Sequence, residues 1–333
     1  MKNIKIIIGI AAVSAILLPS CSGWTEPEAL DYGGNGDVVQ KSDEYLSALR
    51  AFKQTEHKIM ILRMEGTDQQ PFSRNQHISA MPDSADYICV DIVSGSLHSE
   101  IAAEIPQVRQ QKGTRCLNYV DFAVISEEWT ALEDGRPDGE PAGTADEFAA
   151  FCAERTETML SLCDEYGFDG IMFSFQGSIQ DEMTAAGQTA FLSAIKSWRQ
   201  AYPDALLFAR GSLANIVDEH TDILFDCDYT VLVSSTQASL SQLNLLARTF
   251  VRNDDVPSDR IAVEVAVPSE EDPEPACATP QTAAQWVVEP EEDYVKLGVC
   301  VGNAEDDYLV DGTFRNIRAA INILNAAENQ TEE

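Results

Sequence analysis

Short apolar segments alternate with longer amphipathic segments along most of the 333-residue chain. In the amphipathic segments (146–166, 183–201, 238–251 and 314–326), apolar residues recur at the spacing of a surface helix. The apolar runs are short and end in loops, which is typical of buried β-strands. These predicted strands are residues 57–65, 87–93, 115–122, 170–175, 205–209, 229–234, 260–267 and 296–301.

The regular alternation of strand and helix predicts the fold class. It favours parallel strands joined by right-handed crossovers in an α/β protein. Eight such units between residues 37 and 326 fit a single (β/α)8 TIM barrel. An open doubly wound sheet is the alternative, but no GxGxxG motif follows the first predicted strand. Residues 327–333 form a short polar tail.

Three predicted loops are long and rich in Pro, Gly, Asp and Glu. They follow the first, third and seventh strands, at 66–86, 123–144 and 268–279. Loops after the carboxyl ends of the strands form the functional face of a TIM barrel, so we expect these three to shape a cleft.

The first residues predict export and lipid attachment. Lys2 and Lys5 precede an apolar stretch at 6–18 that is too short to span a membrane. The following Leu-Pro-Ser-Cys, ending at Cys21, resembles a bacterial lipobox, which implies a signal peptide at 1–20 and lipidation of Cys21. The acidic tether at 21–36 resembles the export signal of Bacteroidetes-type lipoproteins. The resemblance implies anchoring in the outer membrane, facing the cell exterior.

The charge excludes several classes of partner. The chain carries 55 acidic and 22 basic residues, a formal net charge of −33. Such a surface repels nucleic acid and anionic lipid, so contact with the membrane is expected only through the anchor. Apart from Cys21, seven cysteines are scattered without a CxxC pair, and the four histidines lie at no ligand spacing. We therefore expect no disulfide framework, no metal and no other cofactor.

The fourth strand is the most informative segment. Residues 166–177 read YGFDGIMFSFQG. This segment resembles the fourth strand of family 18 glycoside hydrolases, the chitinases and endo-β-N-acetylglucosaminidases, whose pattern is Asp-Gly-x-Asp-x-Asp-x-Glu. Asp169 and the glycine after it match the opening. The other three acidic positions fall on Met172, Ser174 and Gln176, and none of them is acidic.

The resemblance implies what these replacements do. Side chains alternate across a strand, so residues 172, 174 and 176 are expected to line the barrel and 171, 173 and 175 to face the helices. In the family the glutamate is the general acid, and the preceding aspartate orients the substrate's N-acetyl group, which is the nucleophile. The amide of Gln176 has no proton to give, and Ser174 carries no negative charge. Both can still hydrogen-bond a sugar.

Other segments also bear on the resemblance. Residues 112–117 and 91–94 look like strand segments of the endoglycosidase branch. Residues 233–237 and Gly302, by contrast, lack the aromatics that the family places after strands six and eight. We predict that Asp169 is a structural anchor. Trp129 in the third loop either stacks on a sugar ring or packs on the barrel, and Asp121 ends the third strand at the mouth.

Together these observations predict a catalytically inactive family-18-like barrel at the cell surface. We expect it to bind GlcNAc-containing glycan, such as N-glycan, through Gln176, Ser174, Asp121 and Trp129. Its protein partners would belong to an outer-membrane glycan-uptake system. One alternative is an active endo-β-N-acetylglucosaminidase or chitinase that uses a relocated acid such as Asp121. Another is a scaffold lipoprotein that binds no sugar.

Overall fold

The structure is a computed structural model that describes residues 41–137, 139–178, 181–252, 255–308 and 313–328. The predicted signal peptide, Cys21 and the tether at 21–36 lie outside the described residues, as does most of the polar tail. Within the described ranges, no helix has both the length and the apolar character needed to cross a membrane.

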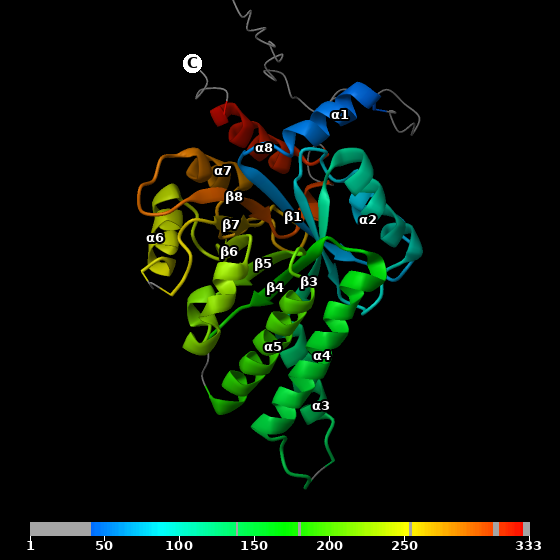
Figure 1. The fold of residues 1–333 in the computed structure, drawn as a ribbon, viewed down its shortest axis with the longest axis vertical. Coiled ribbons are helices and arrows are strands. Elements are labelled where there is room, and N and C mark those ends of the chain that lie inside the picture. Colours follow the sequence, from blue (N-terminus) through cyan, green and yellow to red (C-terminus); the bar gives the residue numbers. More distant parts are fainter. Residues whose placement is uncertain (1–40, 138, 179–180, 253–254, 309–312, 329–333) are drawn as a thin grey trace, which may run out of the picture.

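Eight parallel strands form a closed barrel in chain order, with the last strand paired to the first. The prediction of a (β/α)8 TIM barrel is confirmed (Figure 1). The strands are β1 (Ile59–Gly66), β2 (Tyr87–Ile92), β3 (Arg115–Asp121), β4 (Gly170–Phe175), β5 (Leu206–Gly211), β6 (Tyr229–Val233), β7 (Ile261–Val265) and β8 (Lys296–Val301). Each predicted run overlaps one strand, and the bounds of β4 and β8 are those predicted.

Helices surround the barrel, and α3, α4 and α5 extend together to one end of the molecule (Figure 1). The α-helices are α1 (Asp43–Phe52), α2 (Ser99–Lys112), α3 (Phe122–Asp134), α4 (Ala145–Tyr166), α5 (Glu182–Ala201), α6 (Leu240–Phe250), α7 (Pro280–Val288) and α8 (Arg315–Glu328). Short 3-10 helices are η2 (Arg74–Gln76), η3 (Ile78–Ala80), η4 (Leu213–Asn215), η5 (Asp218–Asp226) and η6 (Ala304–Tyr308). The crossover from β5 to β6 therefore uses η5, not an α-helix.

The prediction that residues 123–144 form a loop is wrong. Helix α3 begins directly after β3, because the carboxylate of Asp121 accepts a hydrogen bond from the amide of Ala123 and caps the helix. Phe122 and Ile125 are buried on its inner face. The two prolines and the glycines of this segment follow α3 and precede α4, so they do not interrupt the helix.

Side-chain alternation on β4 follows the prediction. Met172 belongs to a small core cluster inside the barrel, together with Tyr119 and Phe208. Ile171, Phe173 and Phe175 lie in the larger core between strands and helices. The inner face of β4 therefore presents positions 172 and 174 to the barrel interior.

Candidate functional site

The guanidinium of Arg210 occupies the centre of the barrel mouth, next to the fourth strand. Arg210 is paired in register with Ser174 across β4 and β5. Its Nη1 donates to the hydroxyl of Ser174 at 3.1 Å and lies 3.5 Å from Oε1 of Gln176. Ser174 is fully buried, whereas Gln176 is exposed beyond the end of β4. A fixed positive charge thus lies where the family pattern has carboxylates.

Glu264 on β7 holds Arg210 from across the barrel. Nε of Arg210 donates to Oε2 of Glu264 at 2.6 Å, and Nη2 donates to Oε1 at 2.5 Å, which is a bidentate ion pair. Each residue is only 5% exposed. Burial opposes ionisation of the carboxyl, but the charge and hydrogen bonds of Arg210 outweigh it and hold the pKa of Glu264 below its ordinary value. Both partners are therefore charged at neutral pH.

A second arginine, Arg63 on β1, lies beside this pair. Its Nη2 is 3.9 Å from Glu264, and its Nη1 is 3.6 Å from Asp91 on β2. The two guanidinium carbons lie 5.1 Å (Arg63) and 5.8 Å (Arg210) from the centre of the Tyr119 ring, within range of cation–π attraction. Nε of Arg63 is buried and has no hydrogen-bond partner among the described residues. The side chain of Arg63 as a whole is 21% exposed, so a ligand can reach part of it.

Asp121, the predicted alternative acid, is already engaged. One carboxylate oxygen accepts from the amide of Ala123 and the other accepts from the hydroxyl of Tyr119 at 3.0 Å. That hydroxyl in turn accepts from Arg210 at 3.0 Å. Asp121 thus caps α3 and ends a hydrogen-bond chain that starts at Arg210.

The ion pair explains why no aromatic residue follows β8. A Cβ atom added to Gly302 would lie 2.8 Å from Oε1 of Glu264 and 3.3 Å from Nη2 of Arg63. Any larger residue would have to displace these charged groups. The space next to Gly302, where the resemblance implied an aromatic side chain, is occupied by Glu264 and Arg63.

The other predicted site residues lie apart from this network. Asp169 is at the opposite, amino-terminal end of β4, where its carboxylate accepts from the amide of Cys116 at 2.9 Å and pairs with Arg109 and Arg115. Trp129 packs against Phe148 and Phe151 of α4, with ring centres 5.4 and 5.5 Å apart. The structure brings together Ser174, Gln176 and Asp121 and does not bring Asp169 or Trp129 to them.

A cavity of about 250 Å³ opens beside the network, between β1 and the ends of β6, β7 and β8. The long loop after β7 forms one wall. Polar side chains that line the cavity are Arg63, Ser234, Ser235, Glu264, Asp272 and Asn303. This cavity lies against β1 and the ends of the sixth to eighth strands, and none of its lining residues belongs to the fourth strand.

Two carboxyl groups near the mouth keep their protons more readily than usual. Burial is the main cause in both: it raises the pKa of Asp91 to about 6, although Arg63 opposes this, and that of Glu305 to about 7. Glu305 accepts from the amide of Glu65 through Oε1. Its Oε2 is buried and has no partner among the described residues. Neutral Glu305 therefore fits this site better than its ionised form.

The raised pKa of Glu305 predicts a pH dependence of stability. Below about pH 4.5 the group is protonated in both the folded and unfolded states, and between about 4.5 and 7 it progressively favours the unfolded state as the pH rises. Glu305→Gln should remove this cost and raise the free energy of unfolding at about pH 8 by roughly 2–3 kcal/mol. Urea unfolding at about pH 5 and 8 measures the difference. The exposed Glu292→Gln variant is the control, and an equal gain at both pH values would contradict the assignment.

The sequence prediction missed Arg63, Arg210 and Glu264. A signal was present, because Arg63 and Glu264 are charged residues within predicted strands and Arg210 directly follows one. Buried charges require partners, so three such residues on different strands of one barrel indicate a buried ion pair. Within the described residues, no group of three or more histidine, cysteine, aspartate or glutamate residues is arranged to hold a metal ion.

Comparisons with solved structures agree with the architecture. An endo-β-N-acetylglucosaminidase from Cordyceps militaris in apo form superimposes with a TM-score of 0.60 at 14% identity, covering 87% of this chain and 97% of that one. A variant from the same organism, in complex with fucosyl-N-acetylglucosamine-Asn, gives 0.60 at 15% identity, covering 86% and 97%. A family 18 chitinase from Pseudoalteromonas aurantia gives 0.54 at 12% identity, covering 81% and 99%. At these identities the likeness shows the fold.

No curated protein matches the chain in sequence. A family model described as "Glycoside hydrolase family 18, BT1044-like" matches residues 25–323, which is most of the chain. The resemblance stated from the fourth strand is thereby confirmed. The chain belongs to the BT1044-like group of glycoside hydrolase family 18.

Proposed function

We propose that this protein binds GlcNAc-containing glycan and does not hydrolyse it. The observation that carries the proposal is the guanidinium of Arg210, bonded to Ser174 and close to Gln176, with Glu264 as its fixed partner. The family mechanism needs a proton donor and a negative charge at these positions. The structure has an amide, a hydroxyl and a positive charge there.

The rate enhancement lost with the two acids is large enough to support an inactive barrel. General acid catalysis typically contributes about 10²–10⁴-fold, and Gln176 offers no acidic proton. The family's aspartate stabilises a positively charged intermediate, a contribution of about 10²–10³-fold in comparable electrostatic cases. Here Arg210 would repel that intermediate. The two losses multiply, so turnover by the family mechanism should not be measurable.

Binding can survive these changes. The Cordyceps militaris variant in complex with fucosyl-N-acetylglucosamine-Asn has an asparagine in place of an aspartate and, two positions later, a glutamine in place of a glutamate. Ser174 and Gln176 have the same spacing and likewise lack both acids. A barrel of this fold that lacks both acids therefore still binds that GlcNAc-containing ligand, which supports the same role here.

The cavity beside Arg63 and the exposed side chain of Phe72 are candidate sugar contacts. Arg63 lines the cavity and its side chain is 21% exposed, so its guanidinium can donate to a sugar hydroxyl. Phe72 lies on the loop after β1 and is 88% exposed, so its ring can stack on a sugar face. Neutral sugars fit best, because Glu264 and Asp272 also line the cavity.

A second candidate is hydrolysis by a relocated acid. Asp121 is a poor choice, since both of its oxygens already accept hydrogen bonds. Asp91 is the better one, because burial raises its pKa to about 6 and brings it closer to that of a working general acid. If Asp91 is the acid, the parent protein must release sugar from the glycan, and the Asp91→Asn variant must release none.

The location is part of the proposal. The lipobox-like sequence at Cys21 supports a lipid anchor in the outer membrane, with the barrel outside the cell and serving a glycan-uptake system. Metabolic labelling with a palmitate analogue, compared between the parent and Cys21→Ala, tests the anchor. Equal labelling of the two would contradict it.

The purified barrel, incubated with N-glycoprotein or chitooligosaccharide, should release no sugar above a buffer blank by mass spectrometry. The same ligands should bind in calorimetry, and Arg63→Met should weaken binding by about tenfold through loss of a charge-assisted hydrogen bond. Arg248→Met on the distant α6 is the matched control. Sugar release would overturn the inactive reading, and absence of binding to either ligand would favour a scaffold.

A further inference from the structure

A second and larger cavity, of about 610 Å³, lies at the amino-terminal end of the barrel. It is bounded by the first residues of several strands, including Tyr87 and Tyr229, and by the connection from α1 to β1. The family motif is at the other end, so this cavity is separate from the proposed glycan site. Its volume falls within the range of about 300–1,000 Å³ that is typical of small-molecule sites.

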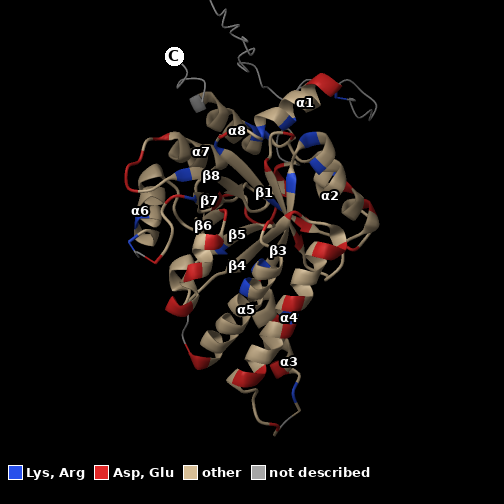
Figure 2. Ribbon diagram, in the orientation of Figure 1, with Lys and Arg blue, Asp and Glu red and all other residues tan. Residues whose placement is uncertain are grey.

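Four basic side chains line this cavity: Arg50 on α1, Lys53 after it, Arg109 on α2 and Arg115 on β3. This grouping stands out in a chain with a formal net charge of −33. Figure 2 shows acidic residues distributed over α3, α4 and α5, whereas several basic positions lie where α1 adjoins α2. An anion that the rest of the surface repels would be attracted here.

Most of the nearby negative charge is already paired. Asp86 interacts with Nε2 of His57 at 2.9 Å and accepts from the amide of Met60. Asp169 is shared by Arg109 and Arg115. Glu56 is the other acidic residue of the lining, and it is exposed. The lining therefore keeps an excess of positive charge.

The guanidinium groups of Arg50 and Arg115 have N–H donors beyond those in the hydrogen bonds given next. Among the described residues, the hydrogen bond of Arg50 is made by Nη1 to the carbonyl of Gln111, and that of Arg115 is made by Nη1 to Asp169. A guanidinium has five N–H donors, and its fork matches a carboxylate or phosphate. The side chain of Arg115 is 50% exposed, so a ligand can reach it.

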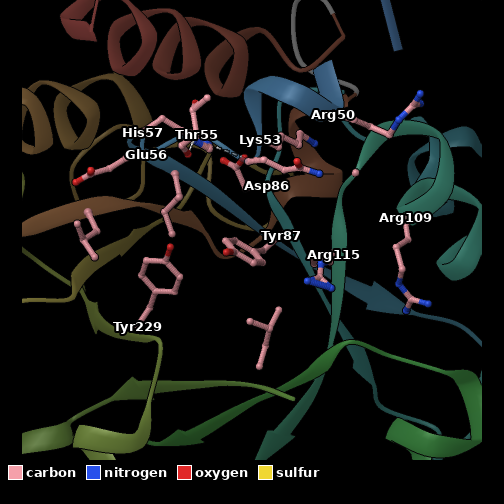
Figure 3. Close-up of a pocket in the computed structure, with 15 residues that line it drawn as sticks. Arg50, Lys53, Thr55, Glu56, His57, Asp86, Tyr87, Arg109, Arg115 and Tyr229 are labelled. Carbon is pink, nitrogen blue, oxygen red and sulfur yellow. Dashed lines mark hydrogen bonds and ion pairs between the residues drawn. The ribbon is translucent and has the colours of Figure 1, made fainter. Parts of the chain in front are cut away.

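Tyrosine rings form the inner part of the same cavity. Tyr87 and Tyr229 are 5.7 Å apart between ring centres, and each packs edge-on against Phe208 inside the barrel. Figure 3 shows the ring of Tyr87 near the centre of the view, Tyr229 on one side of it and Arg115 on the other, with Arg109 and Arg50 further out on the side of Arg115. The cavity therefore has an aromatic part and a basic part side by side.

We propose that the amino-terminal cavity binds a small anion in which a carboxylate or phosphate is attached to a ring, with the acidic group on Arg115 and the ring against Tyr87 and Tyr229, while Arg50 adds positive charge to the same lining. Both acid groups are matched by the same arginine donors. The proposal is independent of the glycan site, because no residue that lines one cavity lines the other.

Calorimetry on the lipid-free barrel tests this with glucuronic acid, glucose 6-phosphate, inorganic phosphate and neutral glucose. Glucuronic acid or glucose 6-phosphate should bind at millimolar concentration or below, and whichever binds more tightly identifies the acid group. Inorganic phosphate should bind more weakly because it has no ring, and glucose should give no signal. The double variant Arg50→Ala with Arg115→Ala should weaken binding of the charged sugar by about tenfold or more.

Arg248→Ala is the control, since Arg248 is 53% exposed, also pairs with a carboxylate and lies outside the cavity. Arg50→Glu alone is a second test, because it leaves the Arg115–Asp169 contact intact and so spares the fold. Binding that is unchanged in these cavity variants would overturn the proposal. So would glucose binding as tightly as the charged sugars, or no binding of either charged sugar at millimolar concentration.

Discussion

Glu264→Ala is expected to lower the free energy of unfolding by about 3–5 kcal/mol, the largest stability effect we predict for a single substitution in this barrel. The variant leaves the guanidinium of Arg210 buried at 5% exposure without its bidentate partner. Arg63 also loses its contact with the same carboxylate. Urea unfolding followed by circular dichroism measures the change.

Two further variants make this test specific. The double variant Arg210→Met with Glu264→Leu should lower the free energy of unfolding by less than Glu264→Ala alone. The reason is that no unpaired charge then remains buried. The exposed Glu292→Ala should change stability by less than about 0.5 kcal/mol. A loss of under about 1 kcal/mol in Glu264→Ala would show that water reaches Arg210.

Restoring the family's acids should not restore hydrolysis. In the double variant Ser174→Asp with Gln176→Glu, both new carboxylates would lie close to the guanidinium of Arg210. An adjacent positive charge lowers the pKa of a carboxyl group, so the new glutamate would stay ionised at neutral pH. A general acid must be protonated in order to donate. The ionised glutamate would therefore not supply the rate enhancement of about 10²–10⁴-fold that general acid catalysis typically gives.

Release of oligosaccharide from N-glycoprotein, followed by mass spectrometry, measures this outcome. An endo-β-N-acetylglucosaminidase that keeps both acids is the positive control for the assay. Calorimetry with the same glycan shows that the variant still folds and binds. Release above the parent level would contradict the role given to Arg210 and would show that the fourth strand alone decides activity.

The fold followed from the sequence because its determinants are local. The periodicity of apolar residues placed all eight strands, and alternation along β4 placed Met172 and Ser174 inside the barrel. The loop predicted at 123–144 was wrong for a local reason as well. Turn-forming residues at its end outweighed the helical spacing of Phe122 and Ile125 and the cap offered by Asp121.

The centre of the site did not follow from the sequence, because it depends on contacts across the barrel. Arg210 and Glu264 are 54 residues apart and lie on strands that are not neighbours. Only closure of the sheet and the stagger of its strands bring them together. The sequence analysis recorded what the fourth strand lacks. It could not show which side chain from another strand fills the space.

The paired charges of Arg210 and Glu264 also bear on the evolutionary history of such a barrel. Removing either residue alone is expected to lower the free energy of unfolding by a large part of the roughly 5–15 kcal/mol that is typical of a domain. Regaining the acids while both remain should give no activity. In a barrel that carries this pair, a single substitution that removes either charge is therefore expected to be poorly tolerated, and recovery of the acids alone is expected to bring no gain in activity.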